Sequence, residues 1–399
     1  MLTKIPDPVA PGTENAPWDC VREPTHPLWS ANLGACRPSE HAAMRPAHAL
    51  INLASLRHNY LLAKQLSPAR ALAVVKANAY GHGAVRCAEA LADLADGYAV
   101  ACIEEALQLR QAEIEHPILL LEGWFEPSEL PLIAEHRLWV VVHHHGQLAD
   151  LEQANLSQPV HVWLKLDTGM HRVGFTPDEY PAIWQTLQAN PQVASLTKIT
   201  HFSRADEPST GRTEQQLEVF EQATRNLEGP RSLCNSAGVL AWPQAHGDWL
   251  RPGIMLYGAT PFDFAQDSAT NLQPVMQLDS KIIAVREVPA NEPIGYGSRF
   301  VTARPTRVGV VAMGYADGYP RHAPDGTPVL VDGLRTTLAG RVSMDMLTVD
   351  LTDLPGTGLG SHIRLWGEGL NASEVAGWAG TIPYQLFCNL NRVPRHYQD

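Results

Sequence analysis

Short apolar runs alternate with helical patterns from Leu53 to about residue 251, and this alternation constrains the fold more than any other feature of the chain. Continuous apolar runs are typical of strands buried on both faces, and a helix between each pair makes the strands parallel. Eight such units favour a (β/α)8 TIM barrel, whose active site lies at the carboxyl ends of the strands. The predicted strands are 72–75, 98–101, 118–121, 138–142, 161–166, 196–202, 232–235 and 249–251.

The pattern changes after about Asn271, where strand-like alternation broken by Gly, Pro and Asp predicts a mostly β C-terminal domain. Its strands are expected at 280–288, 307–313, 329–331 and 347–351, with one helix at 372–378. Residues 1–43 are rich in proline and lack periodicity, so we expect a disordered or non-native extension, with Met44 as a hypothetical start. The predicted domains are therefore an α/β barrel over 44–270 and a β domain over 271–399.

Composition excludes several classes of partner. Thirty basic and 42 acidic side chains give the 399 residues a net charge of −12, which argues against nucleic acid or an anionic membrane as main partner. No apolar run is long enough to span a membrane and no signal pattern opens the chain, so we expect a cytoplasmic protein. Six scattered cysteines favour reduced thiols. The histidines at 143–145 would point to opposite faces of a strand, so we expect no metal site.

Lys76 ends the first apolar run and begins a glycine-broken turn, an unusual position for a lysine. A lysine at the edge of a packed core is poorly solvated, which favours the free amine. A free amine can form a Schiff base with a carbonyl substrate or with pyridoxal phosphate. The alternative is an ordinary strand-end lysine that reaches solvent.

Polar groups also follow the other predicted strands. A phosphate in such a barrel is expected at the loops after strands seven and eight, where the chain has Asn235-Ser236 and 251–254 (RPGI). Strand five ends in 165–172 (KLDTGMHR), and strand six ends at His201. Taken one at a time, Ser236 could be a helix cap, Lys165 a salt-bridge partner and His201 a satisfied strand-end histidine. No nucleotide-binding P-loop is present, and 356–361 lacks the third glycine of a dinucleotide fingerprint.

Together these motifs resemble alanine racemase, and the resemblance runs from Met44 nearly to the C-terminus. The chain is similar in particular to the catabolic isozymes of Gram-negative bacteria. The motifs that carry it, in chain order, are 75–83 (VKANAYGHG), 165–172, Asn235-Ser236, 251–254, 295–297 (GYG), 314–318 (GYADG) and 343–345 (SMD).

The resemblance implies a homodimeric isomerase that uses pyridoxal 5′-phosphate to interconvert L- and D-alanine. Racemisation needs a base on each face of Cα, and the resemblance implies Lys76 on the D-face and Tyr296 on the L-face. Lys76 would also hold the cofactor covalently. Tyr296, Met344 and Asp345 would come from the second subunit, and the substrate would also be contacted by Tyr315.

Further roles follow from the same resemblance. Arg251 would face the pyridine nitrogen, and His201 would pack near the ring. Arg172 would contact the cofactor phenolic oxygen and the substrate carboxylate, beside a carbamylated Lys165. The substrate carboxylate would also meet the backbone N–H of Met344. The implied phosphate ligands are Tyr80, Ser236, Gly253 and Ile254.

One position departs from the family pattern. Some members have a phosphate-binding tyrosine immediately before the C-terminal Arg-Val-Pro-Arg, where this chain has the shorter Asn391. Three alternatives stay open: an amino-acid racemase of broader range, a non-enzymatic pyridoxal-phosphate carrier, and a decarboxylase. Tyr296 and Met344-Asp345 argue against the last two, which need no second base.

Overall fold

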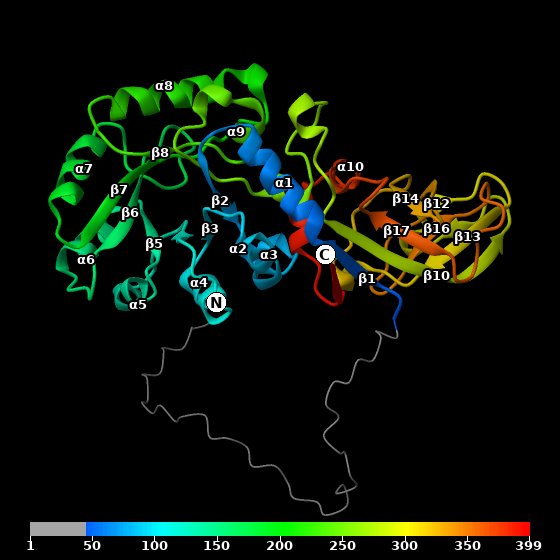
Figure 1. Cartoon of the computed structure of the whole chain (residues 1–399). Coiled ribbons are helices and arrows are strands. Elements are labelled where there is room, and N and C mark those ends of the chain that lie inside the picture. Colours follow the sequence, from blue (N-terminus) through cyan, green and yellow to red (C-terminus); the bar gives the residue numbers. More distant parts are fainter. Residues whose placement is uncertain (1–44) are drawn as a thin grey trace, which may run out of the picture. The chain divides into compact units, whose positions relative to one another are not determined.

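Eight parallel strands form a nearly closed barrel in the computed structural model, which describes residues 45–399 (Figure 1). Their order is β8-β7-β6-β5-β4-β3-β2-β9. The backbone amides of Asp248 and Arg251 donate to the carbonyls of Arg231 and Cys234 at 2.9 and 3.1 Å, which joins the two edges. The predicted barrel is confirmed. The strands are β2 (Arg70–Val74), β3 (Gly97–Val100), β4 (Ile118–Leu120), β5 (Trp139–Val142), β6 (Val160–Lys165), β7 (Val193–Ile199), β8 (Arg231–Ser232) and β9 (Trp249–Leu250).

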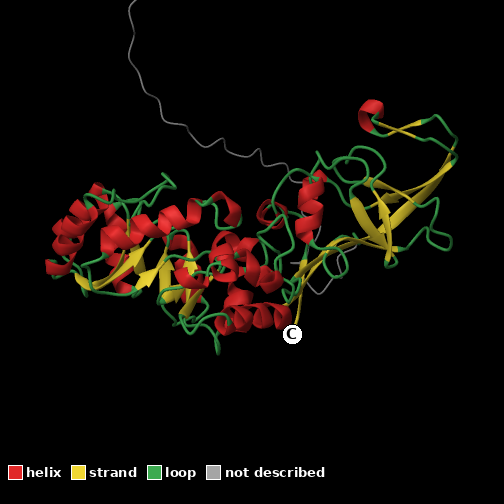
Figure 2. Ribbon diagram, turned by 90° about the horizontal axis from the view of Figure 1, so that it is seen from above, coloured by secondary structure: helices red, strands yellow, loops and turns green. Residues whose placement is uncertain are grey.

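Helices surround the barrel strands (Figure 2), because strands that are apolar on both sides need a covering layer. In α3, for example, Cys87, Ala88 and Leu91 lie on the buried face. The helices are α1 (Leu53–Gln65), α2 (Lys76–Tyr80), α3 (Ala84–Leu91), α4 (Ile103–Gln111), α5 (Leu130–Glu135), α6 (His145–Gln153), α7 (Tyr180–Ala189), α8 (Arg212–Thr224) and α9 (Ser236–Ala241). Short 3-10 turns are η1 (Pro127–Glu129), η2 (Pro208–Thr210), η3 (Pro243–Ala245), η4 (Ile254–Tyr257) and η5 (Asp267–Ala269).

The C-terminal part is mostly β, as predicted. Its main sheet has the path β15-β14-β17-β10-β1-β18, and β13 pairs with both β10 and β16. The long β10 bends at register shifts, which lets it pair with several strands. The strands of this C-terminal part are β10 (Met276–Val288), β13 (Thr306–Val311), β14 (Pro328–Val331), β15 (Leu334–Thr337), β16 (Leu347–Asp350), β17 (His362–Trp366) and β18 (Arg395–Gln398). The helices are α10 (Ala372–Trp378) and α11 (Pro383–Cys388), with a 3-10 turn η7 (Tyr315–Asp317).

A separate two-stranded hairpin, β11 (Pro293–Ile294) and β12 (Phe300–Val301), carries the 3-10 turn η6 (Tyr296–Ser298) at its tip. Figure 2 shows this hairpin projecting from the rest of the β domain, with η6 at its end. The arrangement presents Tyr296 away from the main sheet.

The first strand, β1 (His48–Asn52), pairs with the C-terminal strands although it precedes the barrel. Leu50 lies opposite Gln277 of antiparallel β10 and opposite His396 of parallel β18. These residues fall within the predicted barrel domain, because a short apolar alternation does not reveal a partner far along the chain. The division at residues 43 and 270 stays a prediction, and the proposed extension and start at Met44 lie outside the described residues.

Other features can be stated for the described range. No helix in residues 45–399 is long and apolar enough to cross a membrane. The same residues contain no group of three or more His, Cys, Asp or Glu side chains arranged to hold a metal ion. The free cysteines in this range are Cys87, Cys102, Cys234 and Cys388.

Candidate active site

Lys76 follows the carboxyl end of β2 and opens a turn with an unusual backbone. The next four residues, 77–80, all have φ between 51° and 54°, a left-handed conformation that costs L-residues about 1–2 kcal/mol each. Glu105 supports the turn by accepting from the Ala77 amide at 2.6 Å, and Asn78 caps α3 by accepting from the Ala84 amide at 2.9 Å. Strain held by its surroundings is common where a side chain must be aimed. The turn directs half-buried Lys76 at the barrel rim.

A polar cradle lies after β8 and β9. The Ser236 hydroxyl accepts from the amides of Gly253 and Met255 at 2.8 and 3.2 Å. A Cβ on Gly253 would lie 2.6 Å from the Tyr80 hydroxyl oxygen, so this glycine lets the backbone and the phenol approach each other. Ile254 follows as the first residue of η4. These hydroxyl and amide groups suit an anion such as a phosphate.

Arg251 is 4% exposed and fills the space between β7 and β8 at the rim. Its guanidinium donates to the Ser232 hydroxyl at 2.5 Å and to the Thr200 carbonyl at 2.6 Å, and lies 3.4 Å from His201 Nδ1. Burial lowers the pKa of Arg251 to about 10. The group therefore stays protonated near neutrality and acts only as a hydrogen-bond donor.

Burial and neighbouring cations lower the pKa values of both Lys165 and His201. Burial lowers the pKa of Lys165 well below its ordinary value, and the charges of Arg251, Arg172 and Lys76 lower it further, against the opposing effect of Asp167. Burial and the neighbouring cations also hold the pKa of His201 well below its usual range. The lowered pKa favours the neutral form of each side chain. A small cavity is lined by Lys165, Arg172 and His201.

The remaining predicted residues lie on the β domain. Tyr296 on η6 is 67% exposed, Met344 53% and Tyr315 37%, and Asp345 is also exposed. Within residues 45–399, no hydrogen bond joins these four side chains to the cradle or to the basic groups of the barrel. The structure thus collects Lys76, Lys165, Arg172, His201 and Arg251 at one rim and leaves the others facing outward.

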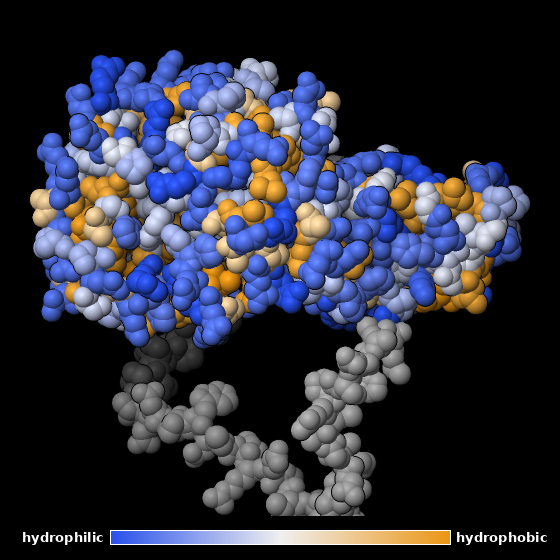
Figure 3. All heavy atoms as spheres, viewed as in Figure 1, coloured by the Kyte–Doolittle hydropathy of each residue, from blue (hydrophilic) through white to orange (hydrophobic). Residues whose placement is uncertain are grey.

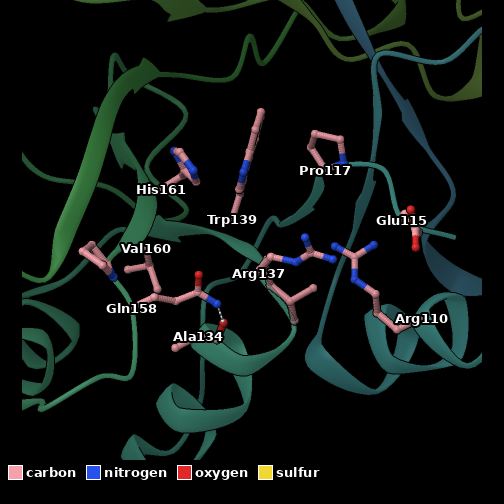
Figure 4. A pocket seen from close by; sticks show the side chains of 11 residues that line it. Arg110, Glu115, Pro117, Ala134, Arg137, Trp139, Gln158, Val160 and His161 are labelled. Atoms are coloured by element: carbon pink, nitrogen blue, oxygen red, sulfur yellow. Dashed lines mark hydrogen bonds between the residues drawn. The ribbon is translucent and has the colours of Figure 1, made fainter. Parts of the chain in front are cut away.

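The cavity shown in Figure 4 lies at the opposite ends of the strands, where β5 and β6 begin. Trp139 and His161 face it from the strands, with Arg110 from α4 and Arg137 from the loop that follows α5. In parallel barrels the amino ends of the strands serve stability rather than chemistry. We therefore do not assign the active site to this cavity.

Comparison with known proteins decides the family. Models of the N-terminal and C-terminal domains of alanine racemase match residues 51–261 and 275–397. The chain belongs to the alanine racemase family. Members of this family are isomerases, as the sequence motifs implied.

Similar proteins span nearly the whole described range. Alanine racemase from Pseudomonas taetrolens and the catabolic alanine racemase of Pseudomonas putida are each 64% identical over 354 residues, covering 89% of this chain and 99% of those proteins. The crystal structure of biosynthetic alanine racemase from Pseudomonas aeruginosa is 51% identical, with a TM-score of 0.87, and covers 89% of this chain and 100% of that one. The catabolic forms named by the resemblance are thus among the relatives.

Two aromatic residues near the site of this alanine racemase family member were not predicted. The Tyr80 ring packs on Tyr257 at 4.9 Å and on Tyr384 at 5.7 Å between centroids, and the Tyr257 hydroxyl donates to the Val74 carbonyl at 2.8 Å. Tyr257 stands just after the 251–254 motif, and this position could have indicated that it lies near the site.

Asn391, the position that departs from the family pattern, donates its backbone amide to the Asp317 carbonyl at 3.2 Å.

Proposed function

We propose that this chain is a pyridoxal 5′-phosphate-dependent alanine racemase that acts as a homodimer with shared active sites. The observation that carries the proposal is the convergence, at one rim, of Lys76, the cradle after β8 and β9, and the buried Arg251. Lys76 follows β2, Ser236 follows β8, and both Arg251 and Gly253 follow β9. Family membership supports the substrate, and a cytoplasmic location stays a prediction.

The described residues fit the cofactor. Lys76 would hold it covalently, and Tyr80, Ser236, Gly253 and Ile254 would bind its phosphate. The cradle supports this role, since a side chain at Gly253 would fill it. When bound, the cofactor supplies an electron sink for the negative charge at the substrate Cα. Arg251 would donate to the ring nitrogen without giving up its proton, which moderates that sink.

Two bases would act on opposite faces of the substrate. Lys76 Nζ would exchange a proton with Cα on the D-face, and Tyr296 Oη would do so on the L-face. A single fixed base cannot reach both faces well. Because Tyr296 is largely exposed on a projecting hairpin, we assign it to the site of the partner subunit.

The other polar residues would orient the substrate. Arg172 and the Met344 amide of the partner subunit would bind its carboxylate, with Asp345 and Tyr315 beside them. We propose that Lys165 is carbamylated: its lowered pKa favours the neutral amine, which can add carbon dioxide and lose a proton. The resulting anion would pair with Arg172 and remove a like-charge contact. His201 would stay neutral against Arg251.

The test is a pair of variants, Lys76→Ala and Tyr296→Phe, assayed from both enantiomers. We expect each to lose about 10²–10⁴-fold in racemisation, the usual contribution of a general base. In deuterium oxide, Tyr296→Phe should still exchange the α-proton of D-alanine but not that of L-alanine. Racemisation retained in both variants would overturn the proposal. Rates with serine, lysine and arginine would reveal a broader racemase.

A further inference from the structure

Asp317 is a fully buried carboxylate bound from both ends of the chain. Its exposed fraction is 0%, and it belongs to η7. Arg45, before the first strand, forms an ion pair with it, with a second contact of 2.8 Å from Nη2 to Oδ2. Arg392, near the last strand, approaches to 3.2 Å. The Gly314 amide donates to Asp317 Oδ2 at 2.8 Å.

Such complete pairing is what a buried carboxylate requires, because an unpaired charge in a protein interior is strongly unfavourable. Burial by itself would raise the pKa of Asp317, but the hydrogen bonds from Arg45 and Gly314, with the charges of both arginines, lower it below its usual range. Asp317 is therefore ionised throughout the neutral range.

Arg45 and Arg392 also hold the neighbouring turn at 343–346. Arg45 Nη2 donates to the Asp345 carbonyl at 2.9 Å, and Arg392 pairs with the Asp345 carboxylate. The amides of Tyr315 and Ala316 donate to the carbonyls of Ser343 and Met344, both at 3.0 Å. Asp317 thus joins η7 to the turn that carries Met344.

The packing leaves little freedom between these segments. A Cβ on Gly314 would lie 2.2 Å from the Met344 carbonyl oxygen. Loss of the Asp317 charge would therefore remove one of the two partners of each arginine and loosen contacts that set the Met344 backbone.

The geometry points to Asp317 as a positioning residue: with Arg45 and Arg392 it fixes the Met344–Asp345 turn and Tyr315 for substrate binding in the partner's site. This inference rests on the proposed function, because it takes the substrate-binding role of Met344 and Tyr315 from there. Asp317 itself contacts no substrate.

Asp317→Asn tests the inference, with Asp279→Asn as matched control. Asp279 is also buried, paired with Arg364 at 3.0 Å and His362 at 3.1 Å, but lies on β10 and makes no contact with the 343–346 turn. We expect Asp317→Asn to raise KM for alanine about tenfold, with a smaller change in kcat. Asp279→Asn should lower the Tm and leave KM unchanged.

A second measurement does not depend on activity. Amide hydrogen exchange on the cofactor-free protein should accelerate at Tyr315, Ala316 and Ser343 in Asp317→Asn, while the barrel amides keep their wild-type rates. Unchanged exchange at these amides, or an unchanged KM, would overturn the inference.

Subunit mixing separates the inference from the shared-site proposal. An equimolar mixture of Asp317→Asn and Lys76→Ala chains, assayed at low alanine, should recover about a quarter of wild-type activity, because half of randomly paired dimers hold one intact site. The mixture of Tyr296→Phe and Lys76→Ala is the reference. If the reference recovers activity and the Asp317 mixture does not, the inference is wrong. If the reference fails, the shared site is wrong, and KM and exchange still decide the role of Asp317.

Discussion

At the residue scale, the cations at the barrel rim lower the pKa of two of their neighbours, Lys165 and His201. Lys165 lies close enough to Arg251, Arg172 and Lys76 for their charges to lower its pKa, in addition to the larger effect of burial. His201 responds in the same direction for the same reasons. Anions stabilise a site with this excess of positive charge, which agrees with the proposed binding of a phosphate and a substrate carboxylate and with a carbamylated lysine.

The lowered pKa of Lys165 has a consequence for stability. In cofactor-free protein and CO2-free buffer, the unfolded chain keeps the Lys165 proton to a higher pH than the folded chain does, because the pKa of this amine is lower in the folded protein. Stability therefore rises with pH from the folded pKa up to the unfolded value of about 10.4. We expect wild type to gain stability over Lys165→Met as the pH rises towards the unfolded pKa, by at most about 1.4 kcal/mol per pH unit, measured by urea unfolding. The control Lys281→Met, at an exposed lysine, should keep the wild-type slope. Parallel curves for wild type and Lys165→Met would contradict the effect of Lys165 on stability.

At the element scale, two strand-to-helix turns build the cradle. The β8–α9 turn contributes Ser236, and the β9–η4 turn contributes Gly253 and Met255. Tyr80 enters from the left-handed turn after β2 and is held there by the rings of Tyr257 and Tyr384. The cradle is thus fixed by packing before any ligand binds, which reduces the ordering cost of binding.

Gly253→Ala should weaken cofactor binding. The added methyl would meet the Tyr80 hydroxyl at 2.6 Å, and the packed phenol cannot move aside freely. We expect the dissociation constant of pyridoxal phosphate to rise about tenfold, about 1.4 kcal/mol, in an absorbance titration of cofactor-free protein. In a Tyr80→Phe background the same change should cost less, because the clashing oxygen is gone.

The matched control is Gly377→Ala. Gly377 lies in α10 and a Cβ there would meet nothing within 4 Å. Alanine should stabilise this helix by up to about 1 kcal/mol and leave cofactor binding unchanged. Equal cofactor affinity in wild type and Gly253→Ala would refute the role given to this glycine.

At the scale of the whole molecule, the β domain exposes several large apolar side chains. They include Tyr296, Val301, Tyr315, Met344 and Met346. Apolar side chains also gather in patches on the face of the molecule shown in Figure 3. The proposed homodimer accounts for this exposure, because Tyr296, Tyr315 and Met344 would then be buried against a second chain.

Dilution tests this assembly. Sedimentation should give a particle of twice the chain mass of 43.7 kDa at micromolar concentration. If sites are shared, specific activity should fall when the enzyme is diluted below the dimer dissociation constant, and return on concentration. Activity that stays constant while the sedimenting species becomes a monomer would exclude shared sites.

Local sequence features predicted much of the fold. The eight barrel strands were found because buried parallel strands are continuous apolar runs, and α10 was found at residues 372–378 as expected. The positions of Lys76, Ser236 and Arg251 at strand ends followed from the strand count. β1 was not placed in the correct sheet, because its partners β10 and β18 lie far away in sequence.

The sequence by itself determined the barrel, the β domain and, through spaced motifs, the family, because apolar periodicity and motif order are local properties of the chain. Only the tertiary structure decided which groups interact: that Arg251 is buried against Thr200 and Ser232, that Lys165 lies among cations that lower its pKa, and that Asp317 joins Arg45 to Arg392. Burial and pairing depend on contacts between distant segments, and no local pattern encodes them.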